Sequence, residues 1–159
     1  MFRLGLNRPM TETRYRIAQA TDVSNAFDFV VKMNHLDFTE NIEAQMNVWN
    51  SEYRTEALEH YFKTGWSFIA EDQNHQIVGF FMGQPLLFFN KNPQSLWVEF
   101  ICGQNADIYT ELVDISFRLS REKHFQAVFY KKEISEKKLT KSFTFQEWNR
   151  ETIFLKTTK

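Results

Sequence analysis

The stretch WSFIAEDQNHQIVGFFMG, residues 66–83, holds two apolar runs joined by a polar turn. Both runs, 66–71 and 76–82, are rich in aromatic and β-branched residues, which favour strands. The four residues between them, DQNH at 72–75, are of the kinds that form turns. The stretch therefore predicts a β-hairpin, and this hairpin decides how the rest of the chain is read.

Upstream of the hairpin, Tyr15 and Ile17 alternate with arginines, which predicts a strand at 14–19. Thr21 and Asp22 can cap a helix that runs to about residue 34. A second helical region spans 41–65, with a break near 50–51 and an end at Gly65. Its predicted apolar stripe consists of Ile42, Met46, Trp49, Tyr53, Ala57, Leu58, Tyr61 and Phe62.

Downstream, the pattern predicts a loop at 85–93 between two prolines, a strand at 96–102, a helix at 105–123, a strand at 127–130, a short helix at 135–142, and closing strands at 143–148 and 152–155. Hairpins at both ends and a strand–helix–strand crossover between them indicate a mixed α/β sheet. We expect a flexible leader at 1–13 and one domain at 14–159.

Composition excludes several functions. The 159 residues carry 19 Lys+Arg against 20 Asp+Glu, a net charge of −1, which argues against a general nucleic-acid binder. Cys102 is the single cysteine, so no internal disulfide can form and a cytoplasmic setting is expected. The sequence has no membrane segment, no glycine-rich phosphate loop and no metal-binding histidine spacing. We therefore expect no metal, no nucleic acid and no membrane partner.

The order of elements resembles the GNAT superfamily of N-acetyltransferases over residues 14–156. Four stretches carry the resemblance: YRIAQATD at 15–22, the hairpin at 66–83, the strand at 96–102 with its following helix, and the closing hairpin. The resemblance implies a mostly antiparallel sheet with a splayed central strand pair and helices on both faces.

The resemblance also implies a function: transfer of an acetyl or other acyl group from acyl-CoA to an amine of a small molecule or a protein. The pantetheine arm would lie along the splayed strand, and the next helix would face the pyrophosphate. A monomer or a homodimer would suffice. The residues implied in cofactor binding are Phe100, Ile101, Cys102, Gly103, Gln104, Asn105 and Ala106.

The sequence departs from the family pattern at the pyrophosphate loop. The family usually has Gln/Arg-x-x-Gly-x-Gly/Ala, whereas this chain has CGQNADIY at 102–109. Gln104 can take the first position, but no glycine follows it, and Asp107 would repel phosphates. In the family, a tyrosine commonly acts as the general acid that protonates the leaving thiolate. This tyrosine is missing here if Thr140 occupies its position. Tyr109 and Tyr130 are either substitutes or, more simply, packed aromatic residues.

Glu99 is the candidate general base, because some family members use a glutamate on this strand. Strict alternation places Glu99 on one face with Trp97 and Ile101, opposite Val98 and Phe100. Apolar neighbours would raise the proton affinity of its carboxylate, as suits a base near neutral pH. The simpler interpretation is a solvated surface charge. A solvated helix face likewise explains the basic run formed by Lys131, Lys132, Lys137, Lys138 and Lys141.

Two other functions remain open. A domain of the same fold could have lost the cofactor and serve as a binding or interaction module, since its pyrophosphate loop departs from the pattern and its aromatic content is high. An unrelated α+β ligand-binding domain is the more distant alternative, and it requires that the strands at 96–102 and 127–130 pair along their whole length.

Overall fold

The computed structural model describes residues 12–34, 42–136, 143–148 and 155–156. Within these ranges it contains a five-stranded sheet of order β1-β2-β3-β4-β5. The strands are β1 (Arg14–Ile17), β2 (Phe68–Glu71), β3 (Ile77–Phe89), β4 (Asn92–Gly103) and β5 (Ala127–Tyr130). Neighbouring strands are antiparallel except for β4 and β5, which run parallel. The predicted mixed, mostly antiparallel sheet is confirmed.

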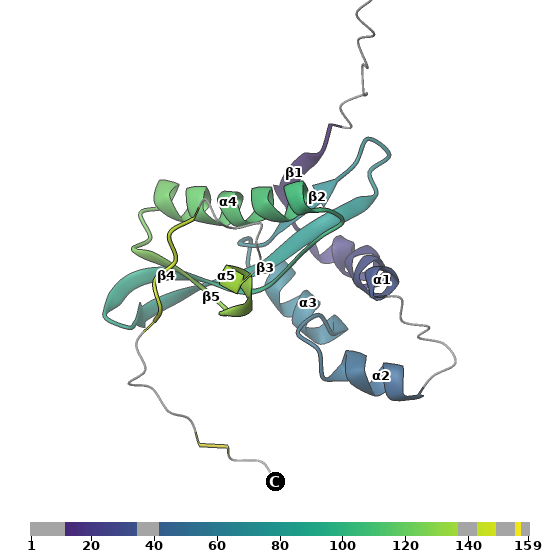
Figure 1. Cartoon of the computed structure of the whole chain (residues 1–159), viewed down its shortest axis with the longest axis horizontal. Coiled ribbons are helices and arrows are strands. Elements are labelled where there is room, and N and C mark those ends of the chain that lie inside the picture. Colours follow the sequence, from purple (N-terminus) through teal and green to yellow (C-terminus); the bar gives the residue numbers. More distant parts are fainter. Residues whose placement is uncertain (1–11, 35–41, 137–142, 149–154, 157–159) are drawn as a thin grey trace, which may run out of the picture.

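Helices lie on both faces of the sheet (Figure 1). They are α1 (Val23–Met33), α2 (Ile42–Trp49), α3 (Thr55–Phe62), α4 (Ala106–Glu122) and α5 (Glu133–Glu136), with a 3-10 turn η1 (Ala20–Asp22) before α1. One core cluster joins α4 to the sheet and a second joins α1 and α3 to the opposite face. Phe80 and Phe81 are fully buried, one in each cluster. Burying such a ring stabilises the fold by roughly 1.5–3 kcal/mol.

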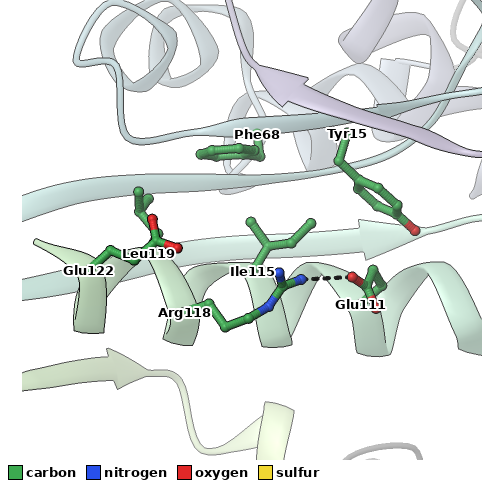
Figure 2. Close-up of a pocket in the computed structure, with 7 residues that line it drawn as sticks. All are labelled: Tyr15, Phe68, Glu111, Ile115, Arg118, Leu119 and Glu122. Atoms are coloured by element: carbon green, nitrogen blue, oxygen red, sulfur yellow. Dashed lines mark hydrogen bonds and ion pairs between the residues drawn. The ribbon is translucent and has the colours of Figure 1, made fainter.

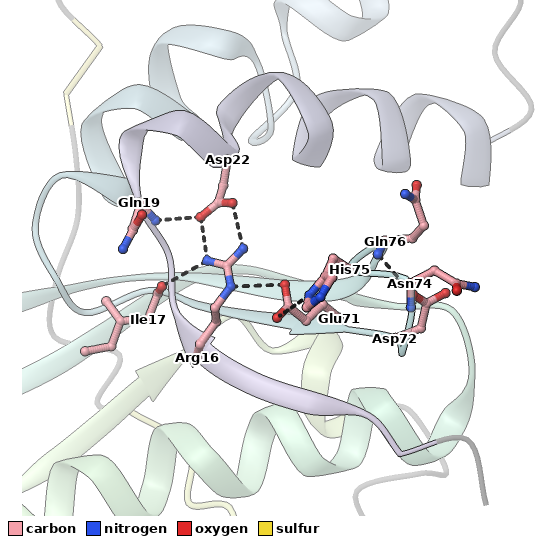
Figure 3. Close-up of polar contacts among 9 residues, drawn as sticks. All are labelled: Arg16, Ile17, Gln19, Asp22, Glu71, Asp72, Asn74, His75 and Gln76. Carbon is pink, nitrogen blue, oxygen red and sulfur yellow. Dashed lines mark hydrogen bonds and ion pairs between the residues drawn. The ribbon is translucent and has the colours of Figure 1, made fainter.

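The predicted central hairpin is confirmed, and its turn chemistry explains the tight connection. Oδ1 of Asp72 accepts the backbone N–H groups of Asn74 at 2.8 Å and Gln76 at 3.0 Å. His75 has a φ of 60°, a left-handed conformation that the polar turn stabilises. These local bonds fix the register of β2 against β3 (Figure 3).

A partly buried charge network, which the sequence analysis did not predict, joins β1 to the start of α1. The Arg16 guanidinium donates to both carboxylate oxygens of Asp22 at 2.8 Å and to Oε2 of Glu71 at 3.1 Å (Figure 3). Asp22 also accepts the backbone N–H of Gln19. The network, which we call the arginine cluster (Arg16, Asp22 and Glu71), fixes the first strand–helix junction.

The predicted loop at 85–93 is wrong, because β3 continues to Phe89 and β4 begins at Asn92. Pro85 pairs with Leu96 of β4, while the pairing of β2 with β3 ends at Phe81. The missing N–H of the proline therefore removes no bond to β2, and a strand can pass through it. The real turn is Asn90-Lys91, with φ values of 50° and 63°.

Two further expectations need correction. Residues 143–148 form no strand, and the other closing strand, at 152–155, lies almost wholly outside the described residues. The stripe predicted for α2 is also wrong: Ile42, Met46 and Trp49 are exposed, and the helix buries Ala44 and Val48 instead. A short helix offers two apolar faces here, and spacing alone selected the wrong one.

Candidate functional site

The parallel pairing of β4 and β5 is short, and the two strands then separate. Four residue pairs join them, from Ser95↔Ala127 to Val98↔Tyr130. Beyond Val98, β4 continues to Gly103, whereas β5 ends at Tyr130 and the chain turns into α5. Residues 99–103 of β4 thus have no β5 partner. The splayed strand pair is confirmed, and the continuous pairing required by the unrelated-domain alternative is not found.

Glu99 lies at the point of separation because β4 carries a bulge there. Met82 pairs with Phe100 and Gly83 with Val98, so Glu99 is the extra residue opposite β3. A bulge reverses the side-chain alternation that follows it. Phe100 accordingly packs with Trp97 on the α1 and α3 face, while Ile101 packs on the α4 face. The prediction that Ile101 shares a face with Trp97, opposite Phe100, is therefore wrong.

The carboxylate of Glu99 has polar partners instead of the predicted apolar surroundings. Its Oε1 accepts from the Lys131 ammonium at 2.8 Å, and its Oε2 accepts from the Trp97 indole at 2.7 Å. The Tyr61 hydroxyl is a further hydrogen-bond partner of this carboxylate. These bonds fix the orientation of the carboxylate at the site where the strands separate, and a carboxylate has about four acceptor positions in all.

Lys131 connects Glu99 to a third element. Its ammonium also lies 3.2 Å from Oε1 of Glu52, in the turn between α2 and α3. We call Glu52, Glu99 and Lys131 the lysine cluster. Both carboxylates raise the pKa of Lys131, although partial burial opposes them. The sequence had placed Lys131 in a solvated basic run; its position directly after β5 was the available signal for a site residue.

Three tyrosines surround the site, and each is packed. Burial and the charge of Glu99 raise the pKa of Tyr61 to about 12. Burial raises the pKa of Tyr130 to about 12, and its hydroxyl is 2.6 Å from Oγ of Ser116. Burial, followed by the nearby Cys102 and Glu133, raises the pKa of Tyr109 to about 12 as well. Thr140 lies outside the described residues.

The turn from β4 to α4 is closed by the chain itself. Only Gln104 and Asn105 separate the strand from the helix. Oδ1 of Asn105 accepts the N–H of Ile108 at 2.9 Å, which caps the helix. A Cβ at Gly103 would lie 2.8 Å from the backbone nitrogen of Tyr109, so the strand already touches the helix. Asp107 stands exposed in the first turn.

The residues therefore fit one part of an acyl-CoA and not another. The edge of β4 at 99–103 fits the amide-bearing pantetheine arm, which can bond to a strand as an added strand would. The start of α4 does not fit the pyrophosphate, because the Asn105 side chain caps one of its first N–H groups and Asp107 adds negative charge. Among the predicted cofactor residues, Phe100 to Gly103 lie on this part of β4, and Gln104 to Ala106 form the turn and the first residue of α4.

Two surface clefts lie away from Glu99. One, of about 380 Å³, lies between α4 and the first two strands, with Tyr15, Phe68 and Ile115 in its wall (Figure 2). Its Arg118 is paired with Glu111 at 2.9 Å and Asp114 at 2.6 Å. The other, of about 550 Å³, is lined by 12–14, 72–73 and His75. Neither includes the lysine cluster.

The described residues contain no cluster of His, Cys, Asp or Glu arranged to hold a metal ion. In the same part of the chain, no helix has both the length and the apolar content to cross a bilayer.

Comparisons with known proteins find the fold but no close relative. No family model and no curated protein sequence matches the chain. A predicted acetyltransferase from Clostridium acetobutylicum, solved with acetyl-CoA, superposes with a TM-score of 0.61 at 16% identity, covering 91% of this chain and 96% of that one.

Two further structures are similar. An aminoglycoside acetyltransferase from an uncultured soil sample, in complex with trehalose, has a TM-score of 0.56 at 14% identity, covering 91% of this chain and 97% of that one. A ribosomal-protein-alanine N-acetyltransferase from Brucella melitensis has a TM-score of 0.56 at 10% identity, covering 91% and 100%. Identities this low establish architecture alone. The chain has the GNAT fold.

Proposed function

We propose that this protein is an N-acyltransferase that moves an acetyl or other acyl group from a pantetheine thioester to an amine of a small molecule or a protein. One observation carries the proposal: the edge of β4 at 99–103 is left without a β5 partner, and Glu99 lies at its start. A strand edge beside a fixed carboxylate provides both a binding surface for the donor and a base for the acceptor.

Glu99 would act on the acceptor. An ammonium cannot attack a carbonyl, so it must first give up a proton, and Glu99 is the carboxylate at the separation point of the strands. Trp97 and Lys131 hold this carboxylate by one oxygen each, which restrains its orientation before the acceptor arrives. Trp97, Lys131 and Tyr61 leave one of the about four acceptor positions of this carboxylate to take the proton.

The bound thioester supplies the activated acyl group. The amine nitrogen forms the new C–N bond as the C–S bond breaks, and the electron pair of that bond leaves with sulfur. The nitrogen loses two protons in all: Glu99 takes the first and returns it to solvent, and the second reaches the released sulfur through solvent. Backbone N–H groups of the part of β4 beyond its last β5 pair would stabilise the developing oxyanion.

A transfer assay tests the proposal. Acyl transfer to a panel of amines is measured by the release of free thiol, and it should be detectable with at least one acyl donor. The same donor should raise the melting temperature. Glu99→Gln should lower kcat/KM by about 100-fold, the lower end of what general-base catalysis contributes. Glu122→Gln, which removes an equal charge from the exposed end of α4, is the control and should change little. An equal rate for Glu99→Gln at every pH would refute the role of Glu99.

The binding-module alternative is favoured by a different observation, the exposed apolar side chains of α2 together with the closed turn before α4. Mass spectrometry of protein purified from cells separates the two functions. A copurified pantetheine thioester counts against the module, and failure of every donor to bind or react supports it.

A further inference from the structure

We infer that the acyl donor is recognised through its pantetheine arm alone, so that the nucleotide end of a coenzyme A thioester adds nothing to its affinity. This inference rests on the proposed acyl transfer and narrows its donor. The chemical class is a pantetheine or phosphopantetheine thioester, whatever is attached beyond the phosphate.

The turn between β4 and α4 leaves little space for a phosphate. A phosphate bound at a helix start needs backbone N–H groups that it can approach closely, and glycines normally allow that approach. Here the turn is only two residues long, Gln104 and Asn105. The Gln104 N–H donates to the carbonyl of Val78 at 2.7 Å. The space where a Cβ of Gly103 would lie is occupied by the backbone of Tyr109. The glycine therefore allows the strand to pack against the helix and leaves no room there for a phosphate.

Hydrogen bonds at the helix start also oppose a phosphate. An α-helix leaves its first N–H groups without internal partners, and these are the groups that would bind a phosphate. In α4 the Asn105 side chain takes one of them, the N–H of Ile108. A pyrophosphate that takes this N–H must displace the cap, and loss of an N-cap destabilises a helix by about 1 kcal/mol.

Charges near the helix start oppose a phosphate as well. Asp107 places a carboxylate in the first turn of α4, where the helix dipole would otherwise attract an anion. The cations that directly follow β5 are already paired: Lys131 with Glu52 and Glu99, and Lys132 with Glu147 at 3.3 Å. A phosphate at the start of α4 would be repelled by Asp107. Lys131 and Lys132 could offset this repulsion only by giving up their present carboxylate partners.

Along β4 the pairing with β5 ends at Val98. Residues 99–103 continue the strand past its last β5 pair, and Phe100 and Cys102 are only partly buried. Amide groups of a pantetheine arm find there the pattern of main-chain donors and acceptors that a neighbouring strand would use. The two ends of a coenzyme A thioester thus meet opposite conditions within a few residues of each other.

The inference is tested with two acyl donors that share the acetyl group and the pantetheine arm. They differ only in the 3′-phosphoadenosine 5′-diphosphate group beyond that arm. Binding of acetyl-CoA and S-acetylpantetheine is measured by titration calorimetry on the full chain, and kcat/KM is measured with the same amine. Both quantities should agree within about 3-fold, less than 1 kcal/mol. A preference for acetyl-CoA of about 30-fold or more, near 2 kcal/mol, would overturn the inference.

The nucleotide fragment provides an independent readout that needs no catalysis. Millimolar 3′-phosphoadenosine 5′-diphosphate should neither raise the melting temperature nor displace S-acetylpantetheine. Displacement at about 0.1 mM or below would show a nucleotide site and contradict the inference, since that affinity is worth more than 5 kcal/mol.

The outcomes separate this inference from the proposed function. Transfer that strongly requires the nucleotide leaves the acyltransferase proposal standing and refutes arm-only recognition. Failure of both donors to bind or react refutes the two proposals together, because a donor that does not bind is not recognised by its arm.

Discussion

The arginine cluster and the lysine cluster have the same arrangement of charges but differ in how exposed their carboxylates are. Each holds one cation between two carboxylates from different elements: Arg16 between Asp22 and Glu71, and Lys131 between Glu52 and Glu99. The cations are equally accessible, at 30% and 29% side-chain exposure. The carboxylates are not: those of the arginine cluster are 11% and 5% exposed, and Glu52 and Glu99 are 41% and 22% exposed.

This difference indicates that one cluster maintains structure and the other is accessible for chemistry. Arginine presents a rigid fork that binds two carboxylate oxygens at once, as it does on Asp22. Lysine is a point charge on a flexible chain, and its contacts are easily exchanged. A site that must admit an acceptor amine benefits from the second arrangement, and a strand–helix junction benefits from the first.

The largest effect should come from Arg16→Met. The substitution leaves Glu71 charged and nearly buried without its cation, which lowers the free energy of unfolding by about 3 kcal/mol. Urea denaturation followed by circular dichroism measures it. Arg14→Met, on an exposed residue of the same strand, is the matched control and should change stability by less than about 0.5 kcal/mol. Equal losses in the two variants would remove the structural role assigned to the cluster.

Lys131→Met should lower the rate of acyl transfer more than it lowers the stability of the fold. Its partners are partly solvated, so the unfolding free energy should fall by about 1 kcal/mol or less. Acyl transfer should fall about 10-fold, mainly in kcat, because Glu99 loses one of its restraints. Lys131→Arg should restore part of the rate. Lys132→Met, at the exposed neighbouring position, is the control. A stability loss above about 3 kcal/mol without a kinetic change would assign the cluster a structural role instead.

The smallest effects concern pH, and the two clusters should respond at opposite ends of the scale. Bonds from Arg16 lower the pKa of Asp22, although burial opposes them. In Glu71, burial raises the pKa but is outweighed by Arg16 and His75, so the pKa is also lowered. The stability that these groups contribute is complete above their unfolded pKa values, near pH 4, and is lost as the pH falls through the lower folded values.

The pKa of Lys131 is shifted in the opposite direction from those of Asp22 and Glu71. Its folded pKa is raised, so its contribution is complete below the unfolded pKa, near 10.4, and is lost as the pH rises through the folded value. The stability difference between the native chain and Arg16→Met should therefore shrink below about pH 4, and that for Lys131→Met should shrink above about pH 10.4. Urea titrations across this range measure both. Parallel curves for the two variants would contradict the distinction.

Much of the fold could be predicted from local chemistry. The turn at 72–75, the left-handed Gly65 that follows α3 and the apolar spacing of α4 all act within a few residues, so a single sequence displays them. The bulge at Glu99 could not be predicted, because it depends on how β4 meets β3. The strand through Pro85 depends likewise on where β2 stops.

The role of Glu99 stays a prediction, and its partners in the lysine cluster were not predicted from the sequence. Glu99 and the strand after it were identified by resemblance, and the geometry places them together. Lys131 and Glu52 were missed as partners because they are 79 positions apart in sequence and meet only through the tertiary fold. The charges of Arg16 and Glu71 likewise meet across 55 positions. Only the arginine on an alternating strand and the glutamate ending an apolar run gave a signal.

Pro85 has a consequence beyond the shape of the hairpin. The outer portion of β3, from Gln84 to Phe89, lies past the last residue that β2 pairs with, and it presents Leu87 and Phe88 to solvent. An open edge with such side chains invites another molecule to add a strand and begin aggregation. The imide nitrogen interrupts the row of donors that an incoming strand would require. The residue thereby protects the longest arm of the sheet against uncontrolled self-association while leaving its pairing with β4 intact.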